Sequence, residues 1–268
     1  MSTVIYISSI ALSVLFLSLL AWKWCVKRSV AVFHGIIIGA LTGFIVSWIT
    51  TSILGLNTVI IMLLELCLIF TISFLAIIFN FYRDPGRVPP ETEKVILSPA
   101  DGKIVYVNSV EKGSLLVSTK GKNKFELTDI MSSDLLNNAA YLVGIDMNIL
   151  NVHVNRAPIE GNILLCKRTR GKFISLRRQE SEISNERVST IIDNGLFKVG
   201  VIQISSRLVR RINAFIKKGD NVSIGQRLGS IVFGSQVDVV LPELNNLRMK
   251  ISPGDEVKAG ITVIARYE

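Results

Sequence analysis

The stretch that decides how the C-terminal part of the chain folds is Gly229-Ser230-Ile231-Val232-Phe233-Gly234-Ser235-Gln236-Val237-Asp238-Val239-Val240-Leu241-Pro242. Two apolar runs rich in Val and Ile flank a Gly-Ser pair, and such runs are typical of short β-strands. We predict strands at Ser230–Phe233 and Val237–Leu241. Glycine permits strained backbone, and the Ser235 hydroxyl can attack the carbonyl carbon of Gly234. The pair is therefore a candidate for self-cleavage, with a simple turn as the alternative.

The same pattern of short apolar runs separated by Gly, Pro, Asn and Asp extends from residue 80 to the C-terminus. It predicts a mainly β (α+β) domain. Further strands are expected at Lys103–Val110, Tyr141–Ile145 and Lys198–Gln203. Short helices are expected at Thr128–Asn137 and at Leu208–Phe215, where apolar residues recur at helical spacing.

One seven-residue pattern occurs twice in this domain, as Gly219-Asp220-Asn221-Val222-Ser223-Ile224-Gly225 and as Gly254-Asp255-Glu256-Val257-Lys258-Ala259-Gly260. Each copy combines a Gly-Asp turn, a buried Val position and a second turn. The pattern resembles the hairpin units of lipoyl and biotinyl carrier domains. It predicts a barrel-sandwich fold and carries no information on activity.

The N-terminal part of the chain has a different composition. The whole chain is 49% hydrophobic and 19% charged, and the apolar excess is concentrated in residues 1–79. Three runs there, Val4–Trp22, Ala31–Leu54 and Thr58–Phe79, are each long enough for a helix to cross a bilayer. We therefore divide the chain into a membrane anchor with three transmembrane helices, residues 1–80, and a catalytic domain, residues 81–268.

The cations beside the spans predict their orientation, because short loops rich in Lys and Arg stay on the cytoplasmic side. Lys23, Lys27 and Arg28 follow the first span, and Arg83 and Arg87 follow the third. The expected protein is a multi-pass protein of the cell membrane, with its N-terminus outside and its catalytic domain in the cytoplasm.

Glu65 is the one acidic residue within the spans. A carboxyl group in hydrocarbon is costly unless it is neutral, bonded to another helix or functional. We favour a neutral Glu65 bonded to a neighbouring helix over a transport site.

Charge and cysteine content exclude several classes of partner. The chain has a formal net charge of +9, which suits an anionic membrane surface, and it carries no nucleic-acid-binding motif. Its three cysteines suggest neither a disulfide framework nor a metal cluster, so no metal is expected.

Four blocks of sequence identify a family resemblance over Arg83–Glu268: Ser98-Pro99-Ala100-Asp101-Gly102, Val152-His153-Val154-Asn155-Arg156-Ala157-Pro158, Asn185-Glu186-Arg187 followed by Ser189-Thr190, and Phe233-Gly234-Ser235 followed by Asp238 and Leu241-Pro242. In content, order and spacing these blocks resemble the short form of the phosphatidylserine decarboxylase family, including its archaeal archaetidylserine decarboxylases.

The resemblance implies a proenzyme that cuts itself between Gly234 and Ser235, leaving chains 81–234, attached to the anchor, and 235–268, which stay associated. Residue 235 would become a pyruvoyl group, the cofactor, which forms a Schiff base with the amine of a serine-headgroup phospholipid. Loss of carbon dioxide would then give the ethanolamine-headgroup lipid, with the pyruvoyl carbonyl accepting electrons as pyridoxal phosphate does elsewhere.

Self-cleavage requires a nucleophile, a base and a group that orients the base. Ser235, His153 and Asp101 fit these roles. His153 is the only histidine after the spans, so it has no competitor as a base near neutral pH.

Two positions depart from relatives. Leu150 stands where the longer branch of the family has a second histidine, so the acid that reprotonates the carbanion stays open, with His153, water or another acid as candidates. Gln236 replaces the Thr or Arg common there, without a physical explanation from sequence.

A cluster of cations, Arg168, Arg170, Arg177 and Arg178, is interrupted by apolar residues and is expected to bind membrane or substrate phosphate. A solvated loop is the alternative. Sequence leaves the lipid tail open, ester-linked acyl or ether-linked isoprenoid. It also leaves the oligomeric state open, with a homo-oligomer among the expected assemblies.

Two other functions fit parts of the sequence. A membrane-tethered carrier module is suggested by the repeated turns and by Met249-Lys250, but the flanking Arg248 and Ile251 do not suit a modified lysine, and Ser235 stays unexplained. A Ser-His-Asp hydrolase would use the same three residues but would retain the Ser235 hydroxyl.

Overall fold

The computed structural model describes residues 2–23, 26–53, 56–90, 93–110, 117–120, 123–126, 139–169, 186–205, 211–232, 235–244 and 246–268. The chain divides into two compact units. One comprises residues 1–82 with 148–150, and the other comprises residues 83–147 with 151–268. We call them the helical unit and the β unit.

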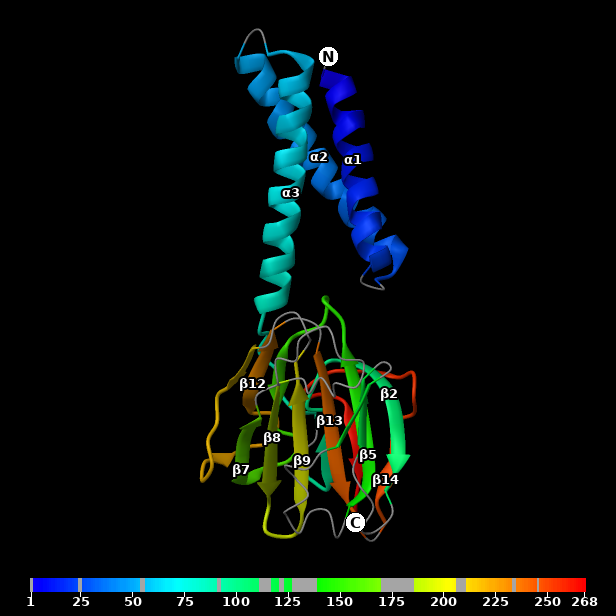
Figure 1. Ribbon diagram of the computed structural model, residues 1–268, viewed down its shortest axis with the longest axis vertical. Coiled ribbons are helices and arrows are strands. Elements are labelled where there is room, and N and C mark those ends of the chain that lie inside the picture. Colours follow the sequence, from blue (N-terminus) through cyan, green and yellow to red (C-terminus); the bar gives the residue numbers. More distant parts are fainter. Residues whose placement is uncertain are drawn as a thin grey trace, which may run out of the picture. The chain divides into compact units, whose positions relative to one another are not determined.

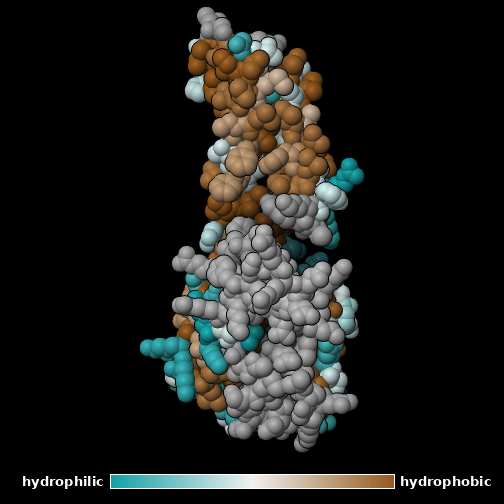
Figure 2. Space-filling model, viewed as in Figure 1, coloured by the Kyte–Doolittle hydropathy of each residue, from teal (hydrophilic) through white to brown (hydrophobic). Residues whose placement is uncertain are grey.

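The helical unit contains three long helices, α1 (Ser2–Lys23), α2 (Arg28–Ser52) and α3 (Thr58–Tyr82) (Figure 1). All three are long and apolar enough to cross a membrane, which confirms the three predicted apolar helices, and their crossing of a membrane stays a prediction. Large apolar side chains such as Trp22, Phe33, Trp48 and Phe79 are exposed, as expected of surfaces that face lipid rather than water. Hydrophobic residues dominate the visible face of this unit in Figure 2.

Helices α1 and α2 approach closely along a row of glycines on α2. A Cβ atom added at Gly39 would lie 2.5 Å from the Cα atom of Ile10, and one added at Gly35 would lie 2.7 Å from the Cα atom of Val14. Small residues at every fourth position allow such contact between membrane helices.

Glu65 of α3 is 1% exposed. Its Oε1 atom accepts hydrogen bonds from the hydroxyl groups of Ser8, at 2.7 Å, and Ser9, at 2.9 Å, both on α1. The predicted bond between Glu65 and a neighbouring helix is thereby confirmed.

The β unit is built mainly of antiparallel strands, which confirms the predicted fold class at that level (Figure 1). Its largest sheet has eight strands in the order β11 (Asn221–Val222), β7 (Gly161–Thr169), β8 (Arg187–Asp193), β9 (Lys198–Ile204), β13 (Ser235–Pro242), β5 (Ala139–Met147), β2 (Gly102–Ser109) and β15 (Glu256–Val257). Two three-stranded sheets have the orders β1 (Val95–Leu97), β16 (Val263–Arg266), β14 (Arg248–Met249), and β10 (Arg211–Ala214), β12 (Arg227–Val232), β6 (Val154–Arg156). β3 (Val117–Lys120) pairs with β4 (Asn123–Glu126).

Both faces of the eight-stranded sheet are buried. Alternate residues of β13, Val237 and Val239, belong to the main core, whereas Val240 belongs to a smaller cluster with Leu142 and Ile202 on the opposite face. β13 lies between β5 and β9, so the segment after Gly234 forms a central strand.

The repeated turn pattern corresponds to a repeat in the structure. β11 and β15 come from the two copies and pair with Gly161 and Gly102 at opposite edges of the eight-stranded sheet. Three backbone hydrogen bonds recur in both copies. In the first copy they run from Ile163 N to Asp220 O, from Gly219 N to Ile163 O and from Gly225 N to Ala157 O. In the second copy the equivalent bonds run from Ile104 N to Asp255 O, from Gly254 N to Ile104 O and from Gly260 N to Ser98 O. The two segments that precede β2 and β7 are joined by bonds from Leu97 N to Pro158 O and from Arg156 N to Pro99 O, which brings the two copies together.

The structure corrects one predicted element and leaves another untested. The helix expected at Leu208–Phe215 is wrong over Arg211–Ala214, which forms strand β10 against β12. Ile212 is fully buried opposite Ile231 in this pair, so strand pairing overrides the helical spacing of the sequence. The helix expected at Thr128–Asn137 lies outside the described residues, and the lipoyl-like barrel-sandwich stays a prediction.

Candidate active site

The candidate cleavage site lies where the chain passes from one sheet to another. β12 of a three-stranded sheet ends at Val232, and β13 of the eight-stranded sheet begins at Ser235, opposite Met147 of β5. Gly234 and the Ser235 side chain lie outside the described part of the structure. A break between residues 234 and 235 would therefore fall at a strand end and leave the ladders of β13 in place.

His153 lies immediately before β6, beside the strand that leads to this junction. Its carbonyl oxygen accepts a 3.1 Å hydrogen bond from the Ile231 amide of β12. Because β12 ends at the next residue, the backbone of His153 is fixed close to the start of the 233–234 connection.

The imidazole of His153 is 2% exposed. Burial lowers its pKa from 6.5 to about 4, while a hydrogen bond with the Asn151 backbone and the charge of Asp101 raise it and the charge of Arg83 lowers it. The ring is therefore neutral at pH 7, which is the form that can accept a proton.

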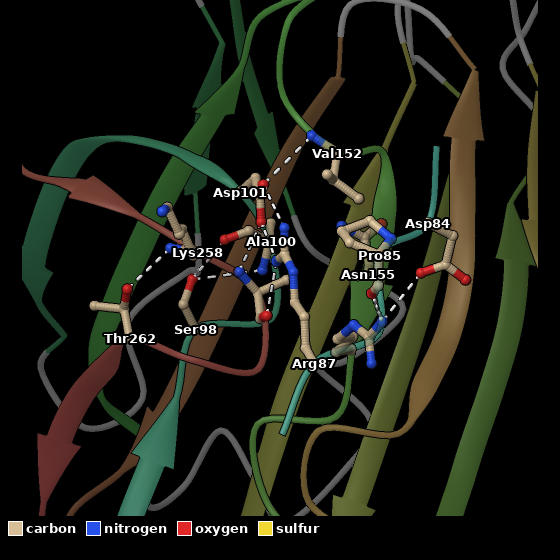
Figure 3. Close-up of polar contacts among 12 residues, drawn as sticks. Asp84, Pro85, Arg87, Ser98, Ala100, Asp101, Val152, Asn155, Lys258 and Thr262 are labelled. Carbon is tan, nitrogen blue, oxygen red and sulfur yellow. Dashed lines mark hydrogen bonds and ion pairs between the residues drawn. The ribbon is translucent and has the colours of Figure 1, made fainter. Parts of the chain in front are cut away.

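Asp101 lies directly before β2 and is 6% exposed. Its Oδ1 atom accepts a 2.8 Å hydrogen bond from the Ala259 amide, and its Oδ2 atom accepts a 3.4 Å bond from the Val152 amide, next to His153. The Ser98 hydroxyl donates a 2.7 Å hydrogen bond to the Ala100 carbonyl and shapes the turn before Asp101 (Figure 3). The carboxylate thus bonds both to the segment that carries His153 and to the C-terminal part of the chain.

Arg87 binds Asp101 with two nitrogens, and the Nη2 to Oδ2 distance is 2.8 Å (Figure 3). Its Nη1 atom also donates to the Ala259 carbonyl at 2.8 Å. In the sequence, Arg87 is recognisable only as a cation that marks membrane orientation, and this contact is not apparent there. The alternation of charge with Pro and Gly in Arg83-Asp84-Pro85-Gly86-Arg87 is the signal that could have found it.

Strand register brings the Ser235 backbone to the same end of the sheet as Asp101. A Cβ atom at Gly102 would lie 2.2 Å from the Asp146 carbonyl oxygen, so only glycine allows β2 to approach the end of β5 so closely. Met147 of β5 lies opposite Ser235 of β13. With neighbouring strands about 4.8 Å apart, the backbones at 102 and 235 are about 10 Å apart.

Two buried polar clusters flank this end of β13. The Gln203 amide donates to Asn155 Oδ1 at 2.7 Å, and Asn155 lies two residues after His153. On the other face the Tyr106 hydroxyl and the Gln236 amide both donate to Asp238, at 2.8 and 2.7 Å. The sequence alone indicates no role for Tyr106, Gln203 or Gln236.

Of the four cations expected to bind phosphate, the structure describes only Arg168. Arg168 forms an ion pair with Glu186 at 3.3 Å and donates to the Ile212 carbonyl. Arg170, Arg177 and Arg178 lie outside the described residues. Leu150, at the position of the missing histidine, is 38% exposed and belongs to the helical unit.

Among the described residues, no three His, Cys, Asp or Glu side chains lie close enough together to hold a metal ion. The groups gathered around Asp101 and His153 are suited to proton transfer and to stabilising charge.

Comparison with known proteins identifies the family. The family model for phosphatidylserine decarboxylase matches residues 74–265. A Methanocaldococcus jannaschii protein named as an archaetidylserine decarboxylase proenzyme is 42% identical over 193 residues, which is 72% of this chain and 91% of that protein. Phosphatidylserine decarboxylase proenzymes of Pelodictyon phaeoclathratiforme and Chlorobium limicola are 37% and 35% identical, over 72% and 76% of this chain and 81% and 86% of theirs.

The matched region covers the whole β unit except its last residues, including the segments around Asp101, His153 and Ser235. The chain therefore belongs to the phosphatidylserine decarboxylase family, whose members are carboxy-lyases.

Proposed function

We propose that this protein is a self-cleaving, pyruvoyl-dependent decarboxylase of a serine-headgroup phospholipid, either phosphatidylserine or archaetidylserine. The observation that carries the proposal is that β12, whose Ile231 amide bonds the His153 carbonyl, is followed in the chain by β13, which begins at Ser235 at the sheet end that holds Asp101. The relatives named as proenzymes support the same function.

In the first step Ser235 Oγ attacks the carbonyl carbon of Gly234, and the carbon–nitrogen bond of that peptide breaks. The hydroxyl proton passes to the neutral imidazole of His153 and from there to the released nitrogen. Asp101 stabilises the charged imidazole, since its negative charge raises the pKa of His153. Elimination then frees a chain that ends at Gly234, and hydrolysis with loss of one ammonia leaves the pyruvoyl group at residue 235.

The arrangement of the strands fits a cofactor at residue 235. The residue begins strand β13, and the backbone of His153, whose ring is neutral at pH 7, is bonded to Ile231 near the end of β12. The pyruvoyl carbonyl would supply the Schiff base with the substrate amine and accept the electrons left by carbon dioxide. His153 and Asp101 then lie where they can hold or return a proton.

The two products of cleavage, residues 1–234 and 235–268, remain associated. In the uncleaved chain the shorter segment contributes β13 between β5 and β9, β15 beside β2, and β16 beside β1. These ladders do not depend on the 234–235 bond, so cleavage leaves their hydrogen bonds intact.

The membrane supplies the substrate. Lys27 and Arg28 hold the loop between α1 and α2 on the cytoplasmic side, and the catalytic domain, residues 81–268, lies on that side as well. The net charge of the chain draws the domain toward anionic lipid, and Arg168, Arg170, Arg177 and Arg178 provide cations for lipid phosphate.

Release of carbon dioxide from serine phospholipid in vesicles tests the proposal. The wild-type protein is expected to be active and to lose activity when borohydride reduces the pyruvoyl carbonyl. Ser235→Ala removes both the nucleophile and the source of the cofactor, so it is expected to abolish cleavage and activity together. Activity that persists in Ser235→Ala, or that resists borohydride in the presence of substrate, would refute the proposal.

A further inference from the structure

The β unit begins with a short segment, Asp84 to Arg87, that is bonded to the candidate site at both ends (Figure 3). At one end, Asp84 accepts a 3.0 Å bond from Arg156 Nη2 and a second bond from Arg227 Nε. Arg156 also donates to the Pro85 carbonyl at 3.0 Å. Arg156 ends β6 and Arg227 begins β12, so this end is fixed to the two strands beside His153.

At the other end, the guanidinium of Arg87 faces both oxygens of Asp101. The two side chains are 10% and 8% exposed. A two-nitrogen contact fixes the orientation of a carboxylate as well as its position, which a single ammonium group does not do. Arg87 also donates to the Ala259 carbonyl, and the Ala259 amide donates to Asp101. Arg87, Asp101 and the Ala259 backbone therefore form a closed ring of contacts.

The internal repeat shows that the turn itself does not need this ion pair. Glu160 precedes Gly161 as Asp101 precedes Gly102, and both glycines pair with the valine of a repeated turn. Glu160 is exposed, whereas Asp101 is buried against Arg87. The same backbone turn therefore forms at Glu160 with an exposed acidic side chain. The buried ion pair with Arg87 is found only at the Asp101 turn of this pair.

We propose that Arg87 is a positioning residue for self-cleavage, which acts through Asp101 by holding its carboxylate toward the His153 segment and by balancing its negative charge. The inference rests on the proposed function of Asp101 and His153 and adds a residue to it. Arg87 does not touch the reacting atoms. It determines where the charge of Asp101 lies when His153 accepts a proton.

The role has a consequence that depends on pH. Among the described residues, the side-chain charges that act on His153 are those of Asp101, which raises its pKa, and Arg83, which lowers it, and Arg87 binds Asp101 directly. Without Arg87, the negative charge of Asp101 is unbalanced and stabilises the imidazolium more strongly, so the pKa of His153 rises. A larger fraction of His153 is then protonated and unable to act as a base as the pH falls toward 4.

The rate of appearance of the chain 235–268 tests this role. Full-length protein is synthesised in a cell-free system into lipid nanodiscs and transferred to buffers from pH 4 to 8.5. Four variants are compared with wild type: Arg87→Met, Arg87→Lys, Ser235→Ala as the uncut reference, and Arg248→Met as a matched control. Arg248 is also paired with an acidic residue, Glu268 at 3.4 Å, but its side chain is 69% exposed.

Arg87→Met is expected to slow cleavage about fivefold more at pH 4 than at pH 7, because a rise of one pKa unit lowers the neutral fraction of a base with a pKa of about 4 from one half to about one eleventh at pH 4 and hardly changes it at pH 7. Arg87→Lys keeps the charge but not the two-nitrogen contact, so it is expected to cleave more slowly than wild type with an unshifted pH profile. Arg248→Met is expected to match wild type.

Cleavage of Arg87→Met at the wild-type rate would overturn the inference. So would slowing by one factor at every pH in both Arg87 variants, because that is the result of a purely structural defect. Should Arg87→Met fail to fold, the comparison of Arg87→Lys with wild type decides, and a normal rate there excludes the role. A wild-type chain that is active but never cut would refute self-cleavage itself, which separates that failure from a failure of Arg87.

Discussion

The Tyr106 hydroxyl donates a 2.8 Å hydrogen bond to the Asp238 carboxylate across the width of strand β5. Tyr106 of β2 and Asp238 of β13 lie opposite the same residue of β5, Gly144. A Cβ atom at Gly144 would lie 2.4 Å from the Tyr106 ring, so glycine leaves the space in which the ring crosses the strand. Gln236, unexplained by sequence, donates a second bond to Asp238, which is fully buried.

Loss of the Tyr106 hydroxyl is expected to destabilise the β unit. Tyr106→Phe removes one donor from a buried carboxylate, which costs about 1–3 kcal/mol in the free energy of unfolding. Denaturant unfolding of the uncut Ser235→Ala protein measures the change, with Tyr267→Phe as a control outside this network. An effect no larger than that of the control would show that the bond does not stabilise the fold.

The same contact can be tested from Gly144. Gly144→Ala is expected to destabilise by more than Tyr106→Phe, because its methyl group meets the aromatic ring rather than removing one bond. In a Tyr106→Ala background the ring is absent, so adding Gly144→Ala should cost little. Equal costs in the two backgrounds would exclude the steric contact.

Asp101 and Glu160 provide a matched pair for the charge required in self-cleavage. Asp101→Asn keeps the size of the side chain but removes the charge that stabilises protonated His153, so cleavage should slow about tenfold or more. Glu160→Gln makes the same change at the equivalent turn and should leave the rate unchanged. Quantification of the 235–268 chain over time distinguishes them, and equal rates in both variants would remove Asp101 from the mechanism.

Several of these features could be predicted from sequence and others could not. β12 and β13 were predicted because their apolar runs carry a local signal, and Glu65 was expected to bond a helix because a carboxyl group in hydrocarbon has few alternatives. The helix predicted at Leu208–Phe215 is wrong over Arg211–Ala214, because the pairing of Ile212 with Ile231 depends on a strand distant in sequence. Arg87 was missed since its partner is defined only once β2 and the C-terminal turn are folded.

Glu65 should contribute to helix packing through its bonds rather than through its charge. Glu65→Gln retains an acceptor oxygen for the hydroxyl groups of Ser8 and Ser9. Glu65→Leu removes that acceptor and is expected to lower the free energy of unfolding by about 1 kcal/mol. Thermal unfolding in detergent compares the two, with Cys67→Ala as a control at an exposed position of the same helix. A Gln variant as unstable as the Leu variant would contradict this interpretation.

The lowered pKa of His153 predicts a specific loss of stability in acid. Its folded pKa of about 4 lies below the unfolded value of 6.5, so its contribution is complete above pH 6.5 and is lost as the pH falls toward 4. A difference of that size corresponds to about 3 kcal/mol. Unfolding of Ser235→Ala with and without His153→Asn isolates the effect. Between pH 7.5 and 4, the free energy of unfolding of the protein that retains His153 should fall by about 3 kcal/mol relative to that of the His153→Asn protein. A difference that stays constant with pH would show that the pKa of His153 is not lowered.

The intact mass of the purified wild-type protein tests self-cleavage most directly. We predict a long chain that ends at Gly234 and a short chain of residues 235–268. The short chain should weigh one ammonia less than the plain peptide and should resist N-terminal sequencing, because a pyruvoyl group has no amine. A single full-length chain, in a preparation that releases carbon dioxide from a serine phospholipid, would contradict the pyruvoyl mechanism.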